Sequence, residues 1–298
     1  MMLIGFDTVK SNLIQSYQNQ KLHHAILLCG KKGIGKASFA KKFVLEILNT
    51  ENSSHPDLLI IEKEAEKKEI GIEKIRNISG FLNQTAAIAL HKFIIIDSAC
   101  ELNKSASNAL LKILEEPHAN NFLILITHNP NRILPTIRSR CQITKIPSLT
   151  AEDFTQIIDK TSSETTEFLT EICDGSISDA INLGPDLSRF YQLFLRSILN
   201  QKLGDELLKQ ISDKNFSFAI AEKIIEFFFN RLIKVANNAQ INFFFDEQKV
   251  FLDLLKNLAP QKTFAIADES LSVLHKAQKL YLDKKLCVIN IFNRICHE

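Results

Sequence analysis

"GKKGIGKAS", residues 30–38, is the stretch of sequence that decides the fold of this chain. Gly30, Gly35 and Lys36 match the phosphate-binding loop, in which Gly-Lys is followed by Ser or Thr. Successive backbone N–H groups of such a loop cradle phosphate oxygens, and its lysine reaches the β and γ phosphates. The hydroxyl position, which normally ligates Mg²⁺, holds Ala37. The motif therefore predicts a nucleotide site that departs from the pattern at its metal ligand.

The sequence on either side of the loop has the context that this motif requires. Residues 24–29 (HAILLC) form a short apolar run typical of a buried parallel strand, and residues 36–48 carry apolar side chains at helical spacing. Gly33 is a further loop glycine, and glycines permit both the backbone angles and the close approach of a phosphate. We therefore interpret the stretch as a true phosphate-binding loop and not as a chance glycine-rich turn.

Strand and helix signals alternate through the first half of the chain. A helix is expected over residues 104–116, which Pro117 closes. Strands separated by helices of this length indicate βαβ crossovers and a parallel sheet covered on both faces, which is an α/β fold. The further strands are expected at residues 57–62, 92–97, 121–127 and 142–147.

After Pro147 the pattern becomes helical. Residues 149–183 hold short helical segments with a Gly-Ser break, and Gly-Pro-Asp at 184–186 suggests a boundary. We therefore predict a sheet domain over residues 1–148, a small helical lid over 149–185 and an all-α domain over 186–298.

The strand at residues 92–97 supplies the second motif of a nucleotide hydrolase. Asp97 is placed to hold the water shell of the metal, but Ser98 stands where a Glu would polarise the attacking water. A serine hydroxyl is a poor base at neutral pH, and loss of a positioned base typically costs about 10²- to 10⁴-fold in rate. Ser38 comes one residue too late to replace Ala37, because one helical residue rotates a side chain by about 100°.

Composition narrows the class of protein. The net charge of +2 does not by itself argue for nucleic acid or membrane, and no apolar run approaches the roughly 20 residues that span a bilayer. The amino-terminal residues are too poor in apolar side chains for a signal peptide. The 6 cysteines contain no C-x-x-C pair, which argues against a local zinc knuckle and favours buried free thiols. We therefore expect a cytoplasmic protein.

Three segments together resemble a known family. Residues 23–43, 91–142 and 173–183 are similar to the bacterial clamp-loader subunits of the AAA+ class, and most of all to the delta-prime subunits of DNA polymerase III. The block from Asn103 to Cys141 is the most specific, because "LLKILEEP", a strand and "SRC" follow in the order and spacing of the family. The resemblance covers residues 1 to about 185 and is weak beyond.

The resemblance implies roles for two further residues. Thr127, at the end of a strand, matches the position that senses the γ-phosphate, and Arg140 matches the arginine finger that reaches into the ATP of a neighbouring subunit. Such a finger can be worth about 10³- to 10⁵-fold in rate. An arginine on the surface or in a local ion pair is the alternative reading of Arg140.

The departures from the family imply a subunit without its own hydrolysis. Ser178 stands where active relatives carry a lid arginine, in addition to Ala37 and Ser98, whereas Arg140 is intact. We therefore expect no enzyme on its own but a non-hydrolysing subunit of a DNA-directed DNA polymerase (nucleotidyltransferase) holoenzyme. No cofactor is expected to be required, and weak nucleotide binding stays open. The degenerate nucleotide site consists of Gly30, Gly33, Gly35, Lys36, Asp97 and Thr127.

The resemblance also implies partners. These are gamma- or tau-like motor subunits, a delta-like subunit, the sliding clamp and primer–template DNA in the assembled ring, with residues 186–298 as an oligomerisation collar and no membrane. Lys104 and Lys112 are candidates for contacts with DNA, with two solvated lysines as the alternative. The four-cysteine module that many relatives carry before His55 is missing, so we predict no zinc. An ATP-hydrolysing motor of the same class and an unrelated P-loop kinase are the competing functions, and the isolated chain is expected to be a monomer.

Overall fold

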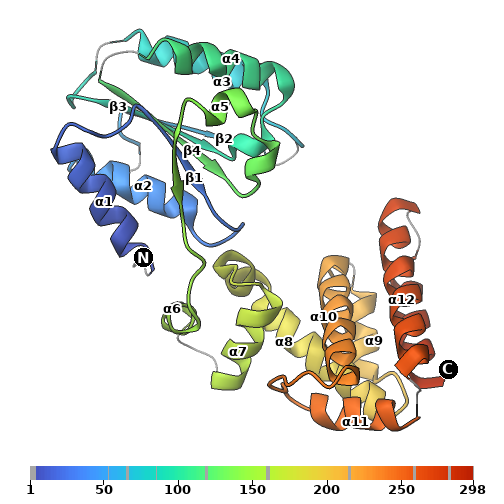
Figure 1. Ribbon diagram of the computed structural model, residues 1–298. Helices are drawn as coiled ribbons and strands as arrows, with labels where there is room; N and C mark the ends of the chain where they lie inside the picture. Colours follow the sequence, from blue (N-terminus) through green and yellow to red (C-terminus); the bar gives the residue numbers. More distant parts are fainter. Residues whose placement is uncertain are drawn as a thin grey trace. The chain divides into compact units, whose positions relative to one another are not determined.

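The computed structural model divides the chain into two compact units (Figure 1). The first comprises Met1–Ile157 with Ser176–Ser178, and the second comprises Ile158–Gly175 with Asp179–Glu298. The residues described are 5–52, 54–64, 67–84, 86–117, 120–158, 162–213, 216–257, 260–280 and 283–297.

The first unit is built on a five-stranded parallel sheet in the order β2-β3-β4-β1-β5. Each expected strand is present, which confirms the α/β prediction. The strands are β1 (Ala25–Cys29), β2 (Leu58–Glu62), β3 (Lys92–Asp97), β4 (Asn121–Thr127) and β5 (Gln142–Lys145). The helices of this unit are α1 (Asp7–Gln18), α2 (Lys36–Ile47), α3 (Ile72–Leu82), α4 (Lys104–Glu115), α5 (Pro135–Arg138) and α6 (Ala151–Ile157), with 3₁₀ turns η1 (Ala99–Glu101) and η2 (Pro130–Arg132).

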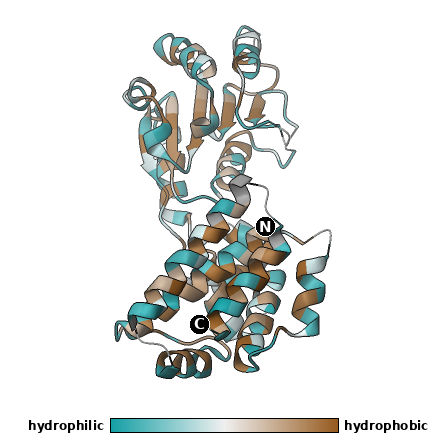
Figure 2. Cartoon of the chain, turned by 90° about the vertical axis from the view of Figure 1, so that its right-hand side faces the viewer, coloured by the Kyte–Doolittle hydropathy of each residue, from teal (hydrophilic) through white to brown (hydrophobic). Residues whose placement is uncertain are grey.

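Helices cover both faces of this sheet (Figure 1). Alternate residues of a strand point to opposite faces, so the continuous apolar run of β1 supplies two cores at once. Leu27 and its neighbours two residues away pack with α3, α4 and α5, whereas Ile26 and Leu28 pack with α1 and α2. Most of the strands in Figure 2 are accordingly hydrophobic over much of their length, whereas β5 is mostly polar and exposed. Two-sided burial explains why β1 to β4 could be recognised in the sequence.

The second unit is all-helical in the residues that the structure describes. Its helices are α7 (Ser163–Ile172), α8 (Ile177–Leu199), α9 (Asp205–Ser212), α10 (Phe218–Ala236), α11 (Glu247–Asn257), α12 (Pro260–Leu280) and α13 (Lys284–His297). Most of these helices show one hydrophobic and one hydrophilic side in Figure 2, which is typical of helices packed around a common core.

The Gly-Pro-Asp stretch at residues 184–186 does not end a helix, because α8 continues through it with Pro185 inside. A proline inside a helix costs about 3 kcal/mol, so packing must offset it. Gly184 contributes to that packing: a Cβ there would lie 3.1 Å from the side chain of Leu169 in α7. The division into three domains stays a prediction, and its boundary between residues 185 and 186 falls within α8.

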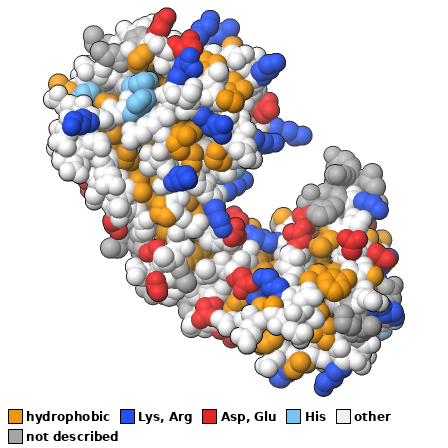
Figure 3. All heavy atoms as spheres, in the orientation of Figure 1, with side chains coloured by type: hydrophobic (Ala, Val, Ile, Leu, Met, Phe, Trp, Pro, Cys, Tyr) orange, Lys and Arg blue, Asp and Glu red, His pale blue; other side chains and the backbone are white. Residues whose placement is uncertain are grey.

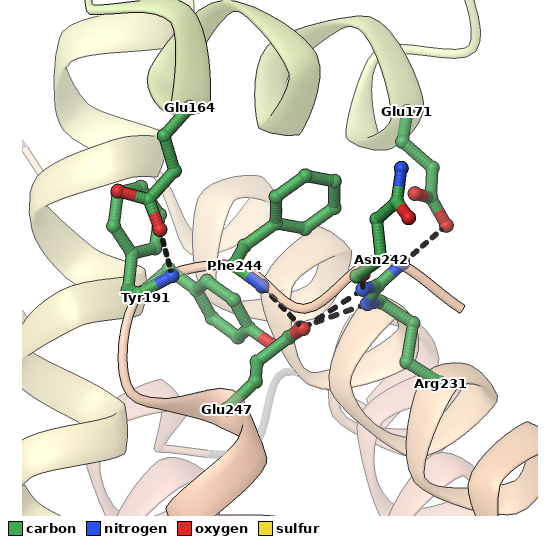
Figure 4. Close-up of polar contacts among 8 residues, drawn as sticks. Glu164, Glu171, Tyr191, Arg231, Asn242, Phe244 and Glu247 are labelled. Carbon is green, nitrogen blue, oxygen red and sulfur yellow. Dashed lines mark hydrogen bonds and ion pairs between the residues drawn. The ribbon is translucent and has the colours of Figure 1, made fainter. Parts of the chain in front are cut away.

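A buried polar cluster joins four helices of the second unit (Figure 4). Arg231 of α10 donates to both carboxylate oxygens of Glu247 at 2.8 Å and to Glu171 of α7 at 2.6 Å. The hydroxyl of Tyr191, from α8, donates to Glu247, and the N–H of Phe244 donates to the same carboxylate at 2.9 Å. Burial is the main cause that raises the pKa of Tyr191, and the Glu247 carboxylate adds to it. The cluster therefore ties α7 to α8, α10 and α11.

No helix in the described part of the chain has both the length and the apolar character needed to cross a membrane.

Candidate functional site

The candidate site lies at the carboxyl edge of the sheet. Strand β4 lies between β1 and β3, and its Thr127 is the register partner of Cys29, the residue before the loop. On the other side of β4, Asp97 pairs with Ile126. In open α/β sheets the carboxyl edge is where ligands bind. The order of the strands therefore brings the loop, Thr127 and Asp97 to one edge.

The loop takes the shape that its glycines permit. Gly33 has φ 77° and Gly35 has φ 96°, both in the left-handed region that favours glycine. A Cβ on Gly30 would lie 3.0 Å from the carbonyl oxygen of Ile146, so the backbone of the next strand approaches closely. Gly35 directly precedes α2, which places the loop at a helix N-terminus, the usual position for a phosphate.

Lys36 is 5% exposed and bonds to its own loop. Its ammonium donates to the carbonyl oxygen of Gly30 at 2.8 Å and to that of Lys31 at 2.5 Å. Burial lowers the pKa of Lys36, and the nearby Asp97 carboxylate acts in the opposite direction. A phosphate would have to compete with two loop carbonyls for this ammonium.

In the first turn of α2, the position that normally ligates a metal offers no oxygen, because it holds Ala37. Ala37 packs its methyl group against the apolar cluster under α1 and α2, and Ser38 is exposed. The loop amides and Lys36 fit a phosphate, whereas the residue that would hold Mg²⁺ lacks a donor atom.

The hydroxyl of Ser98 is engaged with its neighbour. It donates to Asp97 Oδ1 at 2.9 Å and lies 3.5 Å from His128 Nδ1. Asp97, which is expected to hold the water shell of a metal, therefore accepts a hydrogen bond from Ser98, which stands where the catalytic Glu would be.

His128 and Cys100 belong to this edge, although the sequence analysis did not single them out. Cys100 Sγ lies 3.5 Å from His128 Nδ1. Burial lowers the pKa of His128, and the nearby ammonium groups of Lys32 and Lys36 lower it further. The imidazole is therefore neutral at pH 7. Its position directly after Thr127 was the signal that could have found it.

Thr127 is fully buried, and its Oγ1 accepts from the N–H of Asn129 at 3.1 Å. The expected sensor therefore lies at the correct edge with its hydroxyl turned toward the following loop.

The start of α8 lies against the phosphate-binding loop. The N–H of Ser178 donates to the carbonyl oxygen of Gly33 at 3.1 Å. A Cβ on Gly33 would come within 1.9 Å of Ser176 Oγ. Ser178, which occupies the lid-arginine position, thus reaches the loop with its backbone.

Arg140, two residues after α5, lies at the surface with 37% of its side chain exposed. Its Nη1 donates to the carbonyl oxygen of Thr136 at 3.0 Å, and its Nη2 lies 3.0 Å from Glu115 Oε1. The local ion pair considered as an alternative is therefore present, on a side chain that remains accessible.

Lys104 and Lys112 are both exposed on α4. Figure 3 shows Lys and Arg side chains gathered on one side of the unit that carries the sheet. The DNA contact remains a prediction.

The residues around His55 support a turn. His55 Nδ1 accepts from the N–H of Asp57 at 3.1 Å, so the imidazole caps the turn. Within the described residues no group of three His, Cys, Asp or Glu side chains could hold a metal ion. The cysteines are free thiols, and burial raises the pKa of Cys141 to about 12 and that of Cys173 to about 11.

Comparison with known proteins finds similarity to one family in the first unit. Residues 6–150 match the family described as "DNA polymerase III, delta subunit". Over 135 residues the chain is 37% identical to DNA polymerase III subunit delta-prime of Pseudomonas aeruginosa, covering 40% of this chain and 41% of that protein. The matches to this protein and to its Escherichia coli counterpart span less than half the length of either relative.

Longer but weaker similarity extends into the second unit. Over 250 residues the chain is 28% identical to DNA polymerase III subunit gamma of Buchnera aphidicola, covering 75% of this chain and 66% of that protein. The crystal structure of a gamma subunit-related protein from Thermotoga maritima covers 99% of this chain and 100% of that one, with a TM-score of 0.53 and 21% identity. This likeness shows a shared fold.

Proposed function

We propose that this chain, whose residues 6–150 form a module of the DNA polymerase III clamp-loader family, is a delta-prime-like subunit that does not hydrolyse ATP. In this proposal it contributes Arg140 to the ATP site of a neighbouring motor subunit and helps to load a sliding clamp on primed DNA.

One observation carries the proposal: the hydrolytic positions at the carboxyl edge lack the groups that hydrolysis needs. Ala37 has no hydroxyl that could ligate a metal, and the hydroxyl of Ser98 donates a hydrogen bond to Asp97. The ammonium of Lys36 bonds to loop carbonyls. Loss of a positioned base alone costs about 10²- to 10⁴-fold in rate, and loss of the metal ligand acts on the same step.

The state of Arg140 supports the second half of the proposal. Its guanidinium is partly exposed, and its partner Glu115 is an exposed carboxylate. An exposed ion pair contributes only about 0–1 kcal/mol, so a phosphate of higher charge can compete for the guanidinium. A guanidinium supplied in trans stabilises charge on the transferring phosphoryl group.

The expected partners are those that the resemblance to clamp-loader subunits implies, and the names of the gamma, tau and delta relatives support the subunits among them. We infer gamma- or tau-like motor subunits and a delta-like subunit as neighbours, and the sliding clamp and primer–template DNA as targets of the assembled ring. We also propose a cytoplasmic protein. It should need no zinc, because the four-cysteine module before His55 is missing, and no cofactor of its own, because its nucleotide site is degenerate.

Two observations favour the alternative of an active motor subunit. Gamma relatives align over more of this chain than delta-prime relatives do. In addition, the neutral imidazole of His128 lies beside Ser98 and could take the place of the missing base.

ATP turnover by the purified chain separates the two functions. The proposal predicts that the chain alone hydrolyses no more ATP than its Lys36→Ala variant. Turnover that Lys36→Ala abolishes would overturn the non-hydrolysing role. A further loss in His128→Asn would then identify the imidazole as the base.

A further inference from the structure

The guanidinium of Arg140 is held at two points by its own chain. Glu115, the last residue of α4, meets Nη2 at 3.0 Å, and the carbonyl oxygen of Thr136 in α5 accepts from Nη1 at 3.0 Å. The two contacts come from different helices and engage different nitrogens.

Two contacts on different nitrogens fix the plane of the group. A guanidinium is rigid and planar and carries five N–H donors. One interaction at each Nη sets the direction of the fork. The other donors are left to approach an anion.

The position of Glu115 is unusual for a carboxylate. The C-terminal end of a helix carries partial negative charge, which disfavours an acid in its last turn. Glu115 ends α4, and Glu116 is its C-cap. Stabilising α4 is therefore a poor explanation for Glu115, whereas its ion pair with Arg140 is an observed one.

The exposure of the Arg140–Glu115 ion pair indicates that it orients the guanidinium and does not stabilise the fold. The side chains of Arg140 and Glu115 are 37% and 50% exposed. Water screens such a pair, so it adds little to the stability of the fold. The same exposure leaves the guanidinium accessible to another molecule.

We propose that Glu115 is a positioning residue for Arg140: together with the carbonyl of Thr136, its carboxylate orients the guanidinium before a phosphate of the neighbouring subunit arrives. This inference rests on the proposed role of Arg140 as a finger. The advantage is preorganisation. The Arg140 side chain is already restricted to one orientation in this chain, so the entropic cost of ordering it does not add to the barrier of the reaction.

The expected effect concerns the chemical step. Removing Glu115 should free the Arg140 side chain and lower the kcat of the neighbouring site by roughly two- to tenfold. This factor corresponds to the entropic cost of immobilising one long side chain. The KM for ATP should stay unchanged, because the neighbouring subunit holds the nucleotide.

The experiment uses loader complexes reconstituted from this chain with a gamma-like motor and a delta-like subunit. ATP hydrolysis is measured with Glu115→Ala, Glu115→Gln and the matched control Glu116→Ala. We expect Glu115→Ala to lower kcat at constant KM. Glu115→Gln should restore most of the rate, because its amide oxygen still accepts from the guanidinium. Glu116→Ala should leave the rate unchanged.

Two outcomes overturn the inference: a normal or raised rate with Glu115→Ala, or an equal loss with Glu116→Ala. Arg140→Ala is measured in parallel to separate the two proposals. If Arg140→Ala slows hydrolysis and Glu115→Ala does not, only the positioning role fails. If neither variant slows it, the finger fails as well. Unchanged melting temperature and unchanged assembly by gel filtration exclude a merely structural effect.

Discussion

Gly33 lies where the phosphate-binding loop meets the start of α8, and it should tolerate no side chain. A Cβ would come within 1.9 Å of Ser176 Oγ, at a residue whose φ is 77°. Steric overlap and left-handed strain add, so Gly33→Ala should lower the free energy of unfolding by about 1–4 kcal/mol. Urea unfolding followed by circular dichroism measures the change.

The control is Gly80→Ala in α3. Nothing lies within 4 Å of a Cβ on Gly80, and the position is helical and exposed. Alanine there should raise the free energy of unfolding by about 0.5–1 kcal/mol. If both variants changed the free energy of unfolding by the same amount, the close approach of Ser176 to the loop would not contribute to stability.

Glu247 is the most buried acid of the polar cluster, and neutralising it should lower the free energy of unfolding strongly. Glu247→Gln keeps the shape but leaves the guanidinium of Arg231 with only Glu171 as a charged partner among the described residues. Breaking a buried pair on one side costs about 3–5 kcal/mol. Urea unfolding should register a loss of roughly 3 kcal/mol, somewhat reduced by the remaining partner.

Lys249→Met is the matched control for this pair. Lys249 and Asp246 form an ion pair close by in the sequence, but its side chains are exposed. Removing it should change stability by less than about 1 kcal/mol. A similar loss in both variants would contradict the claim that burial makes the difference.

Among the described residues, the loop before β3 carries the most exposed large apolar side chains, and a buried carboxylate holds its backbone. Ile88 and Leu90 are 75% and 83% exposed. The fully buried Asp57 carboxylate accepts from three successive N–H groups of this loop, those of Ala87, Ile88 and Ala89, at 2.7–2.9 Å. One side chain at the start of β2 thus sets the shape of a loop about thirty residues later.

Asp57→Asn should destabilise the chain in a manner that depends on pH. The three N–H bonds outweigh burial and place the pKa of Asp57 below its ordinary value of 3.8. The folded state then binds the proton less readily than the unfolded state. The stabilisation is therefore full above about pH 5, declines once the pH falls below 3.8, and is lost as the pH passes through the lowered pKa of the folded state.

The measurement is urea unfolding of wild type and Asp57→Asn across pH 7 to pH 3. At pH 7 the variant should be about 1–3 kcal/mol less stable. The gap should shrink as the pH approaches 3. A gap that stayed constant over this range would show that the charge of Asp57 does not hold the loop.

Local pattern predicted some elements well and others not at all. Strands β1 to β4 could be found because each is apolar on both faces, and the loop because its glycines stand at fixed spacing. The Gly-Pro-Asp stretch suggested a boundary between domains, yet α8 continues through it and Gly184 packs against α7. The polar cluster around Arg231 could not be predicted from the sequence, because its partners come from α7, α8 and α11 and come into contact only after tertiary folding.

The same limit applies to the candidate site. Asp97 and Lys36 were found through motifs that each occupy one stretch of sequence. The contacts of Ser176 with Gly33 and of Cys100 with His128 join residues that no motif links. Their geometry depends on strand order, which the sequence implies only as a class of fold.

For the molecule as a whole, Arg140→Ala should leave the chain folded and should slow hydrolysis in an assembled loader. The site next to this chain should lose about 10³-fold or more in rate, so total turnover should fall by the share of that site. Steady-state ATPase assays of reconstituted complexes measure the loss. Arg132→Ala, at an exposed arginine in η2, is the control and should have no effect. A normal rate with Arg140→Ala would refute the finger.

The free thiols give this molecule a built-in reporter of unfolding. The chain has no tryptophan and 3 tyrosines, so intrinsic fluorescence is a weak probe. Cys29 is buried in the first unit and Cys173 in the second, and burial raises the pKa of both thiols. An alkylating reagent attacks thiolates, so each should be modified only when its own unit opens. Mass spectrometry of the two tryptic peptides during a denaturant pulse would time the opening of each half of the chain in a single tube.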